Sequence, residues 1–297
     1  MFRKIIAAIA FFLSAACSQP AIAASPQIVP TITALKAGNF TSYGTLYVQG
    51  YAAIGDGGGG SFIWVAGSLP CNSVIGGGDG GTTFCSGNGS GGYLTTGYWK
   101  RQLTNFTYNI LWFGADPTGA APSQVAIQAA QTTACANQPT TPTNSNQLAA
   151  AIYWPRGRYL LTAGVTFGAC YRVRNYGDGW QTSVIMFRPT ANDLVALKCE
   201  EAGAQCANME VDHLGFYSDD TTHRKTALAM VDTTSSTVHD VYCSGSFSTG
   251  LSFSWHDSSN SSNCFLINGR DNSQMRTIQA FADRPIYFGV NPNAAAW

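Results

Sequence analysis

Short strand-like segments recur at nearly regular spacing through the second half of the chain. Three of them are loosely alike: 211–217 (VDHLGFY), 238–244 (VHDVYCS) and 263–269 (NCFLING). Aligning Phe216, Cys243 and Ile267 gives steps of 27 and 24 residues. A repeat of that size, carried by short strands and without helices, is typical of a solenoid.

Two architectures accommodate many short strands. In a parallel β-helix each coil lays its strands on those of the coil before it, so a period holds two or three strands. In a β-sandwich, hairpin turns recur about every 8–12 residues with cleaner alternation of buried and exposed positions. The long, uneven period of this chain favours the parallel β-helix.

Helical periodicity is strong at one place, between Ser123 and Ala134. Ser123 can cap this segment. One face of the helix would hold Val125, Ala126, Ala129, Ala130 and Ala134. Strands then follow at 152–154 and 159–161, with a turn between them. A small helix before a long β region suits a cap that hides the open end of a solenoid from water.

Upstream, residues 25–105 are predicted to form an N-terminal β-rich region. Strand-like segments at 45–50 and 61–65 are separated by a glycine cluster, and a second cluster follows at 76–81. Neither cluster is followed by Gly-Lys-Ser/Thr, so turns and hairpin ends are predicted there instead of a phosphate loop.

The first 24 residues are predicted to be a signal peptide. Arg3 and Lys4 form a charged start, 5–13 are apolar, and 21–23 (AIA) give the small-x-small pattern of a cleavage site. The apolar run is shorter than the roughly 20 residues that span a bilayer. We therefore predict a protein that is secreted, periplasmic or on the cell surface, with no membrane span.

Cysteine usage fits export. Cys17 lies in the leader, and the other eight are Cys71, Cys85, Cys135, Cys170, Cys199, Cys206, Cys243 and Cys264. An even number in an exported chain predicts disulfides. Short loops suggest the pairs Cys71–Cys85 and Cys199–Cys206, and elimination leaves Cys135–Cys170 and Cys243–Cys264. No Cys-x-x-Cys is present, so no metal site is predicted.

The net charge of the chain limits the classes of molecule that it is expected to bind. The formal net charge is zero, only 11% of residues are charged, and no basic stripe exists, which excludes nucleic acid as a natural partner.

Several segments resemble a known family. The run 110–130 (ILWFGADPTGAAPSQVAIQAA) resembles the start of the pectate-lyase-like domain of rhamnogalacturonase-like and epimerase-like proteins. The following 152–161 (IYWPRGRYLL) and 177–185 are similar to its first coils. Upstream, 48–64 (VQGYAAIGDGGGGSFIW) and 98–101 (YWKR) resemble the domain that precedes this fold in phage tailspikes and exported bacterial relatives.

The resemblance implies a fold class: all-β, a right-handed parallel β-helix (solenoid) with a small N-terminal β region and a capping helix. The β-helix would occupy 106–297, after the signal peptide at 1–24 and the β-rich region at 25–105. Two departures stand out. Residues 120–123 (AAPS) replace the paired aspartates of many relatives. The sequence also stops at Trp297 without an evident C-terminal cap, as expected either for a fragment or for an unusually short β-helix.

Two mechanisms are common on such a fold. Hydrolases use one carboxyl group to protonate the leaving oxygen and another to activate water. Lyases remove a proton next to a uronate carboxylate with a Lys or Arg base, and use calcium or a positive group to hold the acid. No cofactor is predicted for a hydrolase, and calcium is expected only for a lyase.

Coil-equivalent polar residues are the candidate site. The alignment places Asp212 and His213 level with His239 and Asp240, about one strand spacing apart. It also places Asp219 and Asp220 near Arg270 and Asp271. Adjacent residues of a strand point to opposite faces, so at most one of His239 and Asp240 is expected to face a groove.

The candidate catalytic residues are therefore Asp219, Asp220, His239 and Asp240. The Asp219–Asp220 pair resembles the adjacent aspartates of polygalacturonases, although the other motifs of that pattern are missing. The candidate substrate-binding residues are Arg224, Lys225, Arg270 and Asp271. Trp180, Tyr217 and Trp255 are candidates for stacking on sugar rings.

Three functions remain open at this point. The leading one is a secreted polysaccharide-degrading enzyme, a glycoside hydrolase or polysaccharide lyase acting on an acidic polysaccharide in a groove along the β-helix. The second is a non-catalytic glycan-binding, adhesin or tailspike-like structural module. The third is uronate epimerisation. The resemblance also implies a homotrimer as one oligomeric state.

Overall fold

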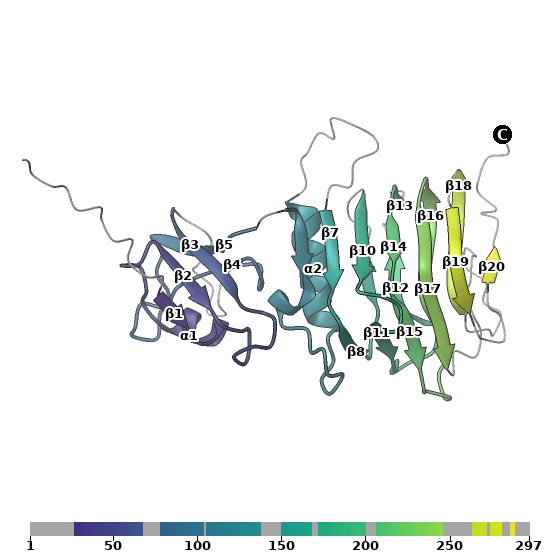
Figure 1. The fold of residues 1–297 in the computed structure, drawn as a ribbon, viewed down its shortest axis with the longest axis horizontal. Helices are drawn as coiled ribbons and strands as arrows, with labels where there is room; N and C mark the ends of the chain where they lie inside the picture. The colour runs from purple at the N-terminus through teal and green to yellow at the C-terminus, as the bar shows by residue number, and fades with distance from the viewer. Residues whose placement is uncertain are drawn as a thin grey trace, which may run out of the picture.

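The computed structural model describes residues 27–67, 78–103, 105–137, 150–167, 172–199, 206–245, 263–271, 274–280 and 286–288. A small N-terminal sheet lies at one end of the long axis, and a stack of parallel strands extends from it (Figure 1). Within the described residues no helix is both long and apolar enough to cross a membrane.

The N-terminal sheet has the strand order β1-β2-β3-β5-β4. The strands are β1 (Gln27–Val29), β2 (Thr45–Val48), β3 (Gly60–Ala66), β4 (Thr83–Phe84) and β5 (Gly97–Arg101). β1 runs parallel to β2, and the remaining pairs are antiparallel. Phe62, Phe84 and Trp99 fill its core, which is separate from that of the β-helix.

A short helix in this region was not predicted. Helix α1 (Ile32–Ala37) is only six residues long, too short to display a helical period in the sequence. The Thr31 hydroxyl caps it by accepting a hydrogen bond from the backbone N–H of Ala34 at 3.2 Å. Ile32 and Leu35 are buried against the sheet.

The remaining strands form the coils. They are β6 (Thr107–Asn109), β7 (Ala150–Trp154), β8 (Gly157–Leu161), β9 (Val165–Phe167), β10 (Val173–Gly177), β11 (Ser183–Phe187), β12 (Leu194–Cys199), β13 (Cys206–Ala207), β14 (Glu210–Asp212), β15 (Gly215–Ser218), β16 (Lys225–Thr234), β17 (Thr237–Gly245), β18 (Asn263–Asp271), β19 (Gln274–Ala280) and β20 (Ile286–Phe288). All their pairings are parallel, coil upon coil, which confirms the predicted parallel β-helix.

The register of the coils corrects one alignment. Phe216 pairs with Cys243, as predicted from the first step of the repeat. However, Cys243 pairs next with Ala280, whereas Ile267 pairs with Met230 in a different sheet. The predicted match of Ile267 with Cys243 is therefore wrong. β17 alone covers two strands of the coil before it, β14 and β15. β18 lies on β16 in the other sheet.

Helix α2 (Gln124–Ala136) covers the first coils and confirms the predicted capping helix (Figure 1). Its buried apolar residues are Ile127, Ala130 and Ala134, whereas Val125 is 78% exposed, so the predicted apolar face was partly wrong. The Ser123 side chain does not cap the helix. Its hydroxyl instead accepts a hydrogen bond from the backbone N–H of Asp116, which fixes the preceding loop.

A short 3₁₀ helix, η1 (Ile110–Phe113), joins the two parts of the molecule. The glycine-rich turn of the N-terminal sheet lies directly on it, since a Cβ at Gly57 would stand 2.6 Å from the Leu111 side chain. Gly114, which ends η1 at φ 91°, lies against the Tyr51 ring, because a Cβ at this position would stand 2.5 Å from that ring. The predicted turn role of the first glycine cluster thus includes a close approach between the two parts.

Arg101 stabilises the same contact between the N-terminal sheet and η1. Its guanidinium is buried and donates hydrogen bonds to the carbonyl oxygens of Gly58, Gly59 and Gly81. It also lies 4.6 Å from the ring centroids of both Phe62 and Trp112. Burial lowers the pKa of Arg101 to about 9, which leaves the group charged at neutral pH.

Cys85, Cys135, Cys199 and Cys243 are disulfide-bonded. Each belongs to a different predicted pair. Their predicted partners, Cys71, Cys170, Cys206 and Cys264, lie outside the residues or side chains that the structure describes. The pairings therefore stay predictions, as does the signal peptide, because 1–26 also lie outside the described residues.

Candidate functional site

One row of side chains crosses successive coils on the outer face of the β-helix. Tyr153 of β7, Tyr176 of β10, Asp212 of β14, His239 of β17 and Arg276 of β19 are direct register partners. The predicted alignment of Asp212 with His239 is thus correct. Stacked strands stand about 4.8 Å apart, so neighbouring members of the row are within reach of one another.

His239 lies between two carboxylates. Its Nδ1 atom is 2.8 Å from Oδ2 of Asp240, and its Nε2 atom is 2.9 Å from Oε1 of Glu210. The His239 side chain is 22% exposed, that of Glu210 25% and that of Asp240 37%. The three groups therefore form one partly open cluster that solvent or a ligand can reach.

The expectation that His239 and Asp240 face opposite sides of the strand is wrong. Asp240 has φ 51°, in the left-handed region, and strict alternation along the strand is lost there. His213 and Thr277, the equivalent residues of the neighbouring coils, have φ 54° and 50°. A stacked corner of left-handed residues thus brings both His239 and Asp240 to the outside.

Asp212 is the buried member of the row. Its carboxylate is fully buried and accepts hydrogen bonds from Nε and Nη2 of Arg174 at 2.7 and 2.8 Å. Its Oδ1 atom also lies 2.5 Å from Nδ1 of His213. The His213 ring meets the His239 ring edge-to-face at 5.8 Å between centroids. Asp212 therefore sets the orientation of Arg174 and His213.

The pKa values of His239 and Asp240 shift in opposite directions. Burial alone would lower the pKa of His239, but the carboxylates of Asp240 and Glu210 outweigh it and raise that pKa above its usual value. The hydrogen bond from His239 lowers the pKa of Asp240. Both shifts favour a protonated imidazole next to an ionised carboxylate, the arrangement that general acid–base chemistry uses.

Aromatic rings flank this cluster on both sides of the corner. Tyr153 and Tyr176 stack at 5.2 Å between centroids, and the Arg174 guanidinium lies 4.6 Å from the Tyr176 ring. Beyond the corner, Trp180 stacks on Tyr242 at 4.5 Å. All four aromatic residues are partly exposed. Flat rings of this kind offer stacking faces to a planar or ring-shaped ligand.

Two of the three predicted stacking residues lie within the described part of the chain, and both contact another side chain. Trp180 stacks on Tyr242, and Tyr217 lies under Arg158 at 5.9 Å. The third, Trp255, lies outside the described residues.

The predicted aspartate pair lies away from this row, just after β15. Asp219 forms a two-pronged ion pair with Arg188 at 2.6–2.7 Å, with both side chains open to solvent. Asp220 is more enclosed, with a 13% exposed side chain. It accepts hydrogen bonds from Thr222 and lies 3.1 Å from Nδ1 of His223.

Asp220 also neutralises a buried cation. The Nζ atom of Lys225, whose side chain is fully buried, lies 3.2 Å from the Asp220 carboxylate and also bonds the Asp220 carbonyl oxygen. Burial would raise the pKa of Asp220, but hydrogen bonds from Thr222, Lys225 and His223 outweigh it and hold that pKa well below its usual range. Burial lowers the pKa of Lys225. Asp220 and Lys225 thus form an ion pair that stabilises the fold.

The other predicted binding residues do not meet at one place. Arg224 is fully engaged with Asp193 on the preceding coil, at 2.7–3.0 Å. Asp271 pairs in register with Thr234 at the far end of β16, whereas Lys225 and the preceding Asp220 lie at its beginning. The predicted proximity of Arg270 and Asp271 to Asp219 and Asp220 is therefore wrong. The cause is the placement of β18 beside β16.

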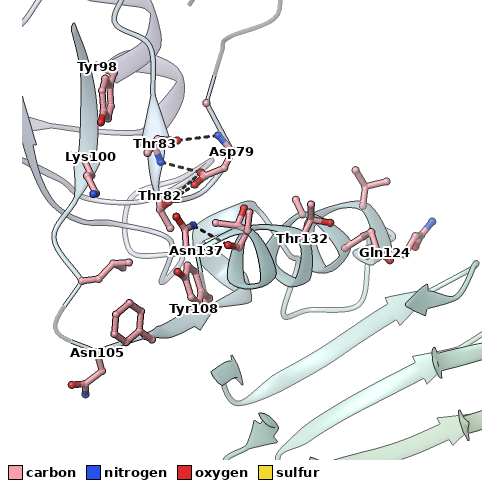
Figure 2. Close-up of a pocket in the computed structure, with 18 of the residues that line it drawn as sticks. Asp79, Thr82, Thr83, Tyr98, Lys100, Asn105, Tyr108, Gln124, Thr132 and Asn137 are labelled. Atoms are coloured by element: carbon pink, nitrogen blue, oxygen red, sulfur yellow. Dashed lines mark hydrogen bonds between the residues drawn. The ribbon is translucent and has the colours of Figure 1, made fainter. Parts of the chain in front are cut away.

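A separate cavity of about 1180 Å³ lies between the N-terminal sheet and α2. Figure 2 shows Tyr98 and Lys100 on one side and Gln124 and Thr132 of α2 on the other. The Asp79 carboxylate turns back to accept hydrogen bonds from Thr82 and Thr83, and therefore stabilises its own turn (Figure 2). This cavity contains neither a cluster of carboxylates nor a histidine.

Sequence reasoning missed Arg174, Glu210 and the Tyr153–Tyr176 stack. Each is a single polar or aromatic residue inside a short strand, without a motif around it. Only the register of β7, β10, β14 and β17 brings them together. Alternation within β10 and β14 carries a signal, because Arg174, Tyr176 and Glu210 all occupy non-interior positions.

Comparison with known proteins supports the architecture. Residues 28–104 match the model of a family described as the phage tail protein small four-stranded beta-sheet domain. The antiparallel strands β2, β3, β5 and β4 form such a sheet, to which β1 adds a fifth strand. No curated protein matches the chain.

Several solved structures share the fold. Tailspike protein gp49 of Acinetobacter baumannii bacteriophage Fri1, a capsular polysaccharide depolymerase, aligns with a TM-score of 0.56 at 12% identity, over 92% of this chain and 50% of that one. The gp42 tailspike of Acinetobacter phage vb_AbaP_AS12 aligns with a TM-score of 0.56 at 16% identity, over 87% and 40%.

The enzymatically active domain of bacteriophage CBA120 tailspike protein 2 aligns with a TM-score of 0.53 at 14% identity, over 86% of this chain and 34% of that one. The chain thus spans at most half the length of these three proteins, and at such low identity the likeness is one of fold. The protein combines a tailspike-like N-terminal region with a parallel β-helix of the kind found in phage tailspikes.

Proposed function

We propose that the protein binds a polysaccharide along the outer face formed by β7, β10, β14 and β17 and cleaves it there. The observation that carries this proposal is the His239 imidazole, held between the Asp240 and Glu210 carboxylates and flanked by stacked aromatic rings. Proton donor, ionised base and the Tyr153–Tyr176 stack thus lie on one face of one sheet, and the Trp180–Tyr242 stack follows beyond the corner.

The chemistry follows from the two pKa directions. Substrate first displaces one of the two carboxylates from His239, and the protonated His239 then donates its proton to the leaving glycosidic oxygen. The displaced carboxylate, Glu210 or Asp240, takes a proton from the attacking water, and the other stays hydrogen-bonded to the imidazole. The glycosidic bond breaks, the bond from water to the anomeric carbon forms, and the proton count balances.

The acidic polysaccharide predicted from the sequence remains a proposal, because the face carries the carboxylates of Glu210, Asp212 and Asp240 beside its two arginines. Arg276 is exposed and follows His239 in the row, whereas Arg174 is the register partner of Glu210 and is paired with Asp212. A polysaccharide substrate agrees with the fold, because the gp49 tailspike that shares it is described as a capsular polysaccharide depolymerase. A location outside the cytoplasm, a homotrimer, and calcium in the case of elimination remain predictions.

A second function, glycan binding without cleavage, is favoured by one observation. Both ring nitrogens of His239 already have carboxylate partners, so substrate must displace one of them before proton transfer begins. If that displacement does not occur, the face retains its aromatic rings and cations and acts as a binding surface only.

The first experiment compares binding and cleavage on the same glycans. The chain is incubated with a panel of acidic and neutral polysaccharides, and new reducing ends are measured together with the ultraviolet absorbance of unsaturated uronates. Reducing ends without that absorbance are expected. Appearance of the absorbance would indicate elimination instead of hydrolysis. Binding without new ends would establish the second function, and neither binding nor cleavage would refute the proposal.

Asp240→Asn and Glu210→Gln then assign the base. Each variant removes one negative charge with little change in shape, and Asn also tolerates the left-handed backbone at position 240. Loss of cleavage with retained glycan binding is expected for the carboxylate that activates water. Equal and full activity in both variants would remove these two residues from the mechanism.

A further inference from the structure

We propose that His213, His239 and Asp240 together bind one divalent transition-metal ion, of which zinc is the reference ion. One ligand atom from each of the three residues lies within 4.8 Å of the others. Two imidazoles and one carboxylate, with a remaining position open to solvent, are a donor set that zinc and similar ions accept.

Each histidine is already oriented by a carboxylate on its other nitrogen. The Asp212 carboxylate holds Nδ1 of His213, which leaves Nε2 of that ring for a metal. The Glu210 carboxylate holds Nε2 of His239, which leaves Nδ1 next to the Asp240 carboxylate. Carboxylates behind metal-binding histidines fix the tautomer and raise the basicity of the ring.

The required movement is small. Bonds of about 2.0–2.1 Å in a tetrahedron separate ligand atoms by about 3.3 Å. The Nδ1 atom of His239 and Oδ2 of Asp240 are 2.8 Å apart and must separate slightly. His213 must approach, and its side chain is 45% exposed, so rotation meets little packing. Asp240 and His213 both lie on the stacked left-handed corner, which fixes their backbones.

The donor atoms favour zinc over calcium or magnesium. Those ions take mainly oxygen ligands, whereas two of the three donors here are imidazole nitrogens. The surrounding charges favour a cation, because Glu210, Asp212 and Asp240 are all within one cluster. Arg174 neutralises Asp212 in part, and Arg276 on the next coil opposes the ion.

Metal binding itself does not depend on the proposed cleavage, but it has a consequence for it. The ion takes Nδ1 of His239 and the Asp240 carboxylate, the atoms that the proposed proton transfer uses. If the cleavage proposal holds, zinc at saturation inhibits cleavage.

The test uses the complete chain, without a histidine tag, after treatment with a chelator. Zinc is titrated calorimetrically, and cobalt(II) is titrated in parallel by visible absorption, which reports imidazole ligands. The expected result is one ion per chain. His213→Asn is the first variant, since Asn tolerates the left-handed backbone at φ 54°. A loss of affinity of at least about tenfold is expected, together with loss of the cobalt absorption bands.

His223→Asn is the matched control, because His223 is also half-buried and next to a carboxylate but lies with Asp220, outside the cluster. It is expected to bind zinc as the unmodified chain does. Thermal unfolding checks that both variants are folded. Failure of the unmodified chain to bind, or equal binding by His213→Asn, would overturn the proposal. Neither readout involves a glycan, so failure of the cleavage proposal leaves this test intact.

Discussion

His239 and Asp240 are neighbours in the chain, yet their side chains meet outside the β-helix at 2.8 Å. The left-handed backbone of Asp240, φ 51°, produces this meeting, and the same corner recurs at His213 and Thr277 on the adjacent coils. A corner that repeats from coil to coil thus places adjacent titratable groups on one surface, where a straight strand would separate them.

The His239 cluster predicts a pH dependence of stability. Because the folded state raises the pKa of His239, the stabilisation is fully present below the unfolded value of about 6.5 and is lost as pH rises through the folded pKa. The melting-temperature difference between the unmodified chain and His239→Gln should therefore be larger at about pH 6 than at about pH 9. A difference that grows with pH would contradict the proposed charge state.

The two adjacent aspartates are expected to differ in stability. Asp220→Asn removes the charge that faces the buried Lys225, and should cost about 3 kcal/mol in the free energy of unfolding. Asp219→Asn removes half of an exposed ion pair, and should cost less than about 1 kcal/mol. Urea unfolding measures both. Equal effects would mean that the Lys225–Asp220 contact is not structural.

Acid should weaken the same contact. The pKa of Asp220 is lowered in the folded state, so its contribution is present above the unfolded value of about 4 and disappears as pH falls below it. The stability difference between the unmodified chain and Asp220→Asn is expected to shrink on acidification. A constant difference from neutral to acid pH would exclude this origin.

The joint between the two parts depends on Gly114. Alanine there would require φ 91° and would place a Cβ 2.5 Å from the Tyr51 ring, so Gly114→Ala should cost about 2–3 kcal/mol. Gly89→Ala is the matched control, because Gly89 has φ 78° and open space around it. It should cost about 1 kcal/mol. Thermal or urea unfolding compares the two variants.

The aromatic pair beyond the corner offers a test of glycan contact. Trp180→Ala removes the ring that stacks on Tyr242 and should weaken glycan binding severalfold. Trp112→Ala is a comparison that removes a tryptophan from the joint, where it meets Arg101. Glycan affinity, measured calorimetrically on the folded variants, should fall for Trp180→Ala alone.

The fold could be predicted because a solenoid repeats its pattern. The step from Phe216 to Cys243 is a true coil, and it correctly placed Asp212 beside His239. The next step failed because the similar segment at 263–269 belongs to β18, which lies on β16 in the other sheet, whereas the strand that continues this sheet is β19. Coils of unequal length carry no fixed period from which such a shift could be seen.

The site was predicted only in part, for a related reason. His239 and Asp240 stood out because adjacent titratable groups are visible in a sequence. Glu210 and Arg174 did not, since their roles come from contacts across coils. Asp240 itself has a left-handed backbone, and single His, Asp and Thr residues in strands, as at His213, Asp240 and Thr277, give no clear local signal of a corner.

The most direct measurement compares glycan cleavage by the unmodified chain, His239→Gln and His223→Gln on a polysaccharide that the chain binds. Glutamine keeps hydrogen-bonding capacity at both positions and removes the titratable ring. We predict that His239→Gln binds the glycan but releases reducing ends at least about 100-fold more slowly, while His223→Gln retains full activity. Undiminished cleavage by His239→Gln would contradict the assignment of this outer face as the reaction site.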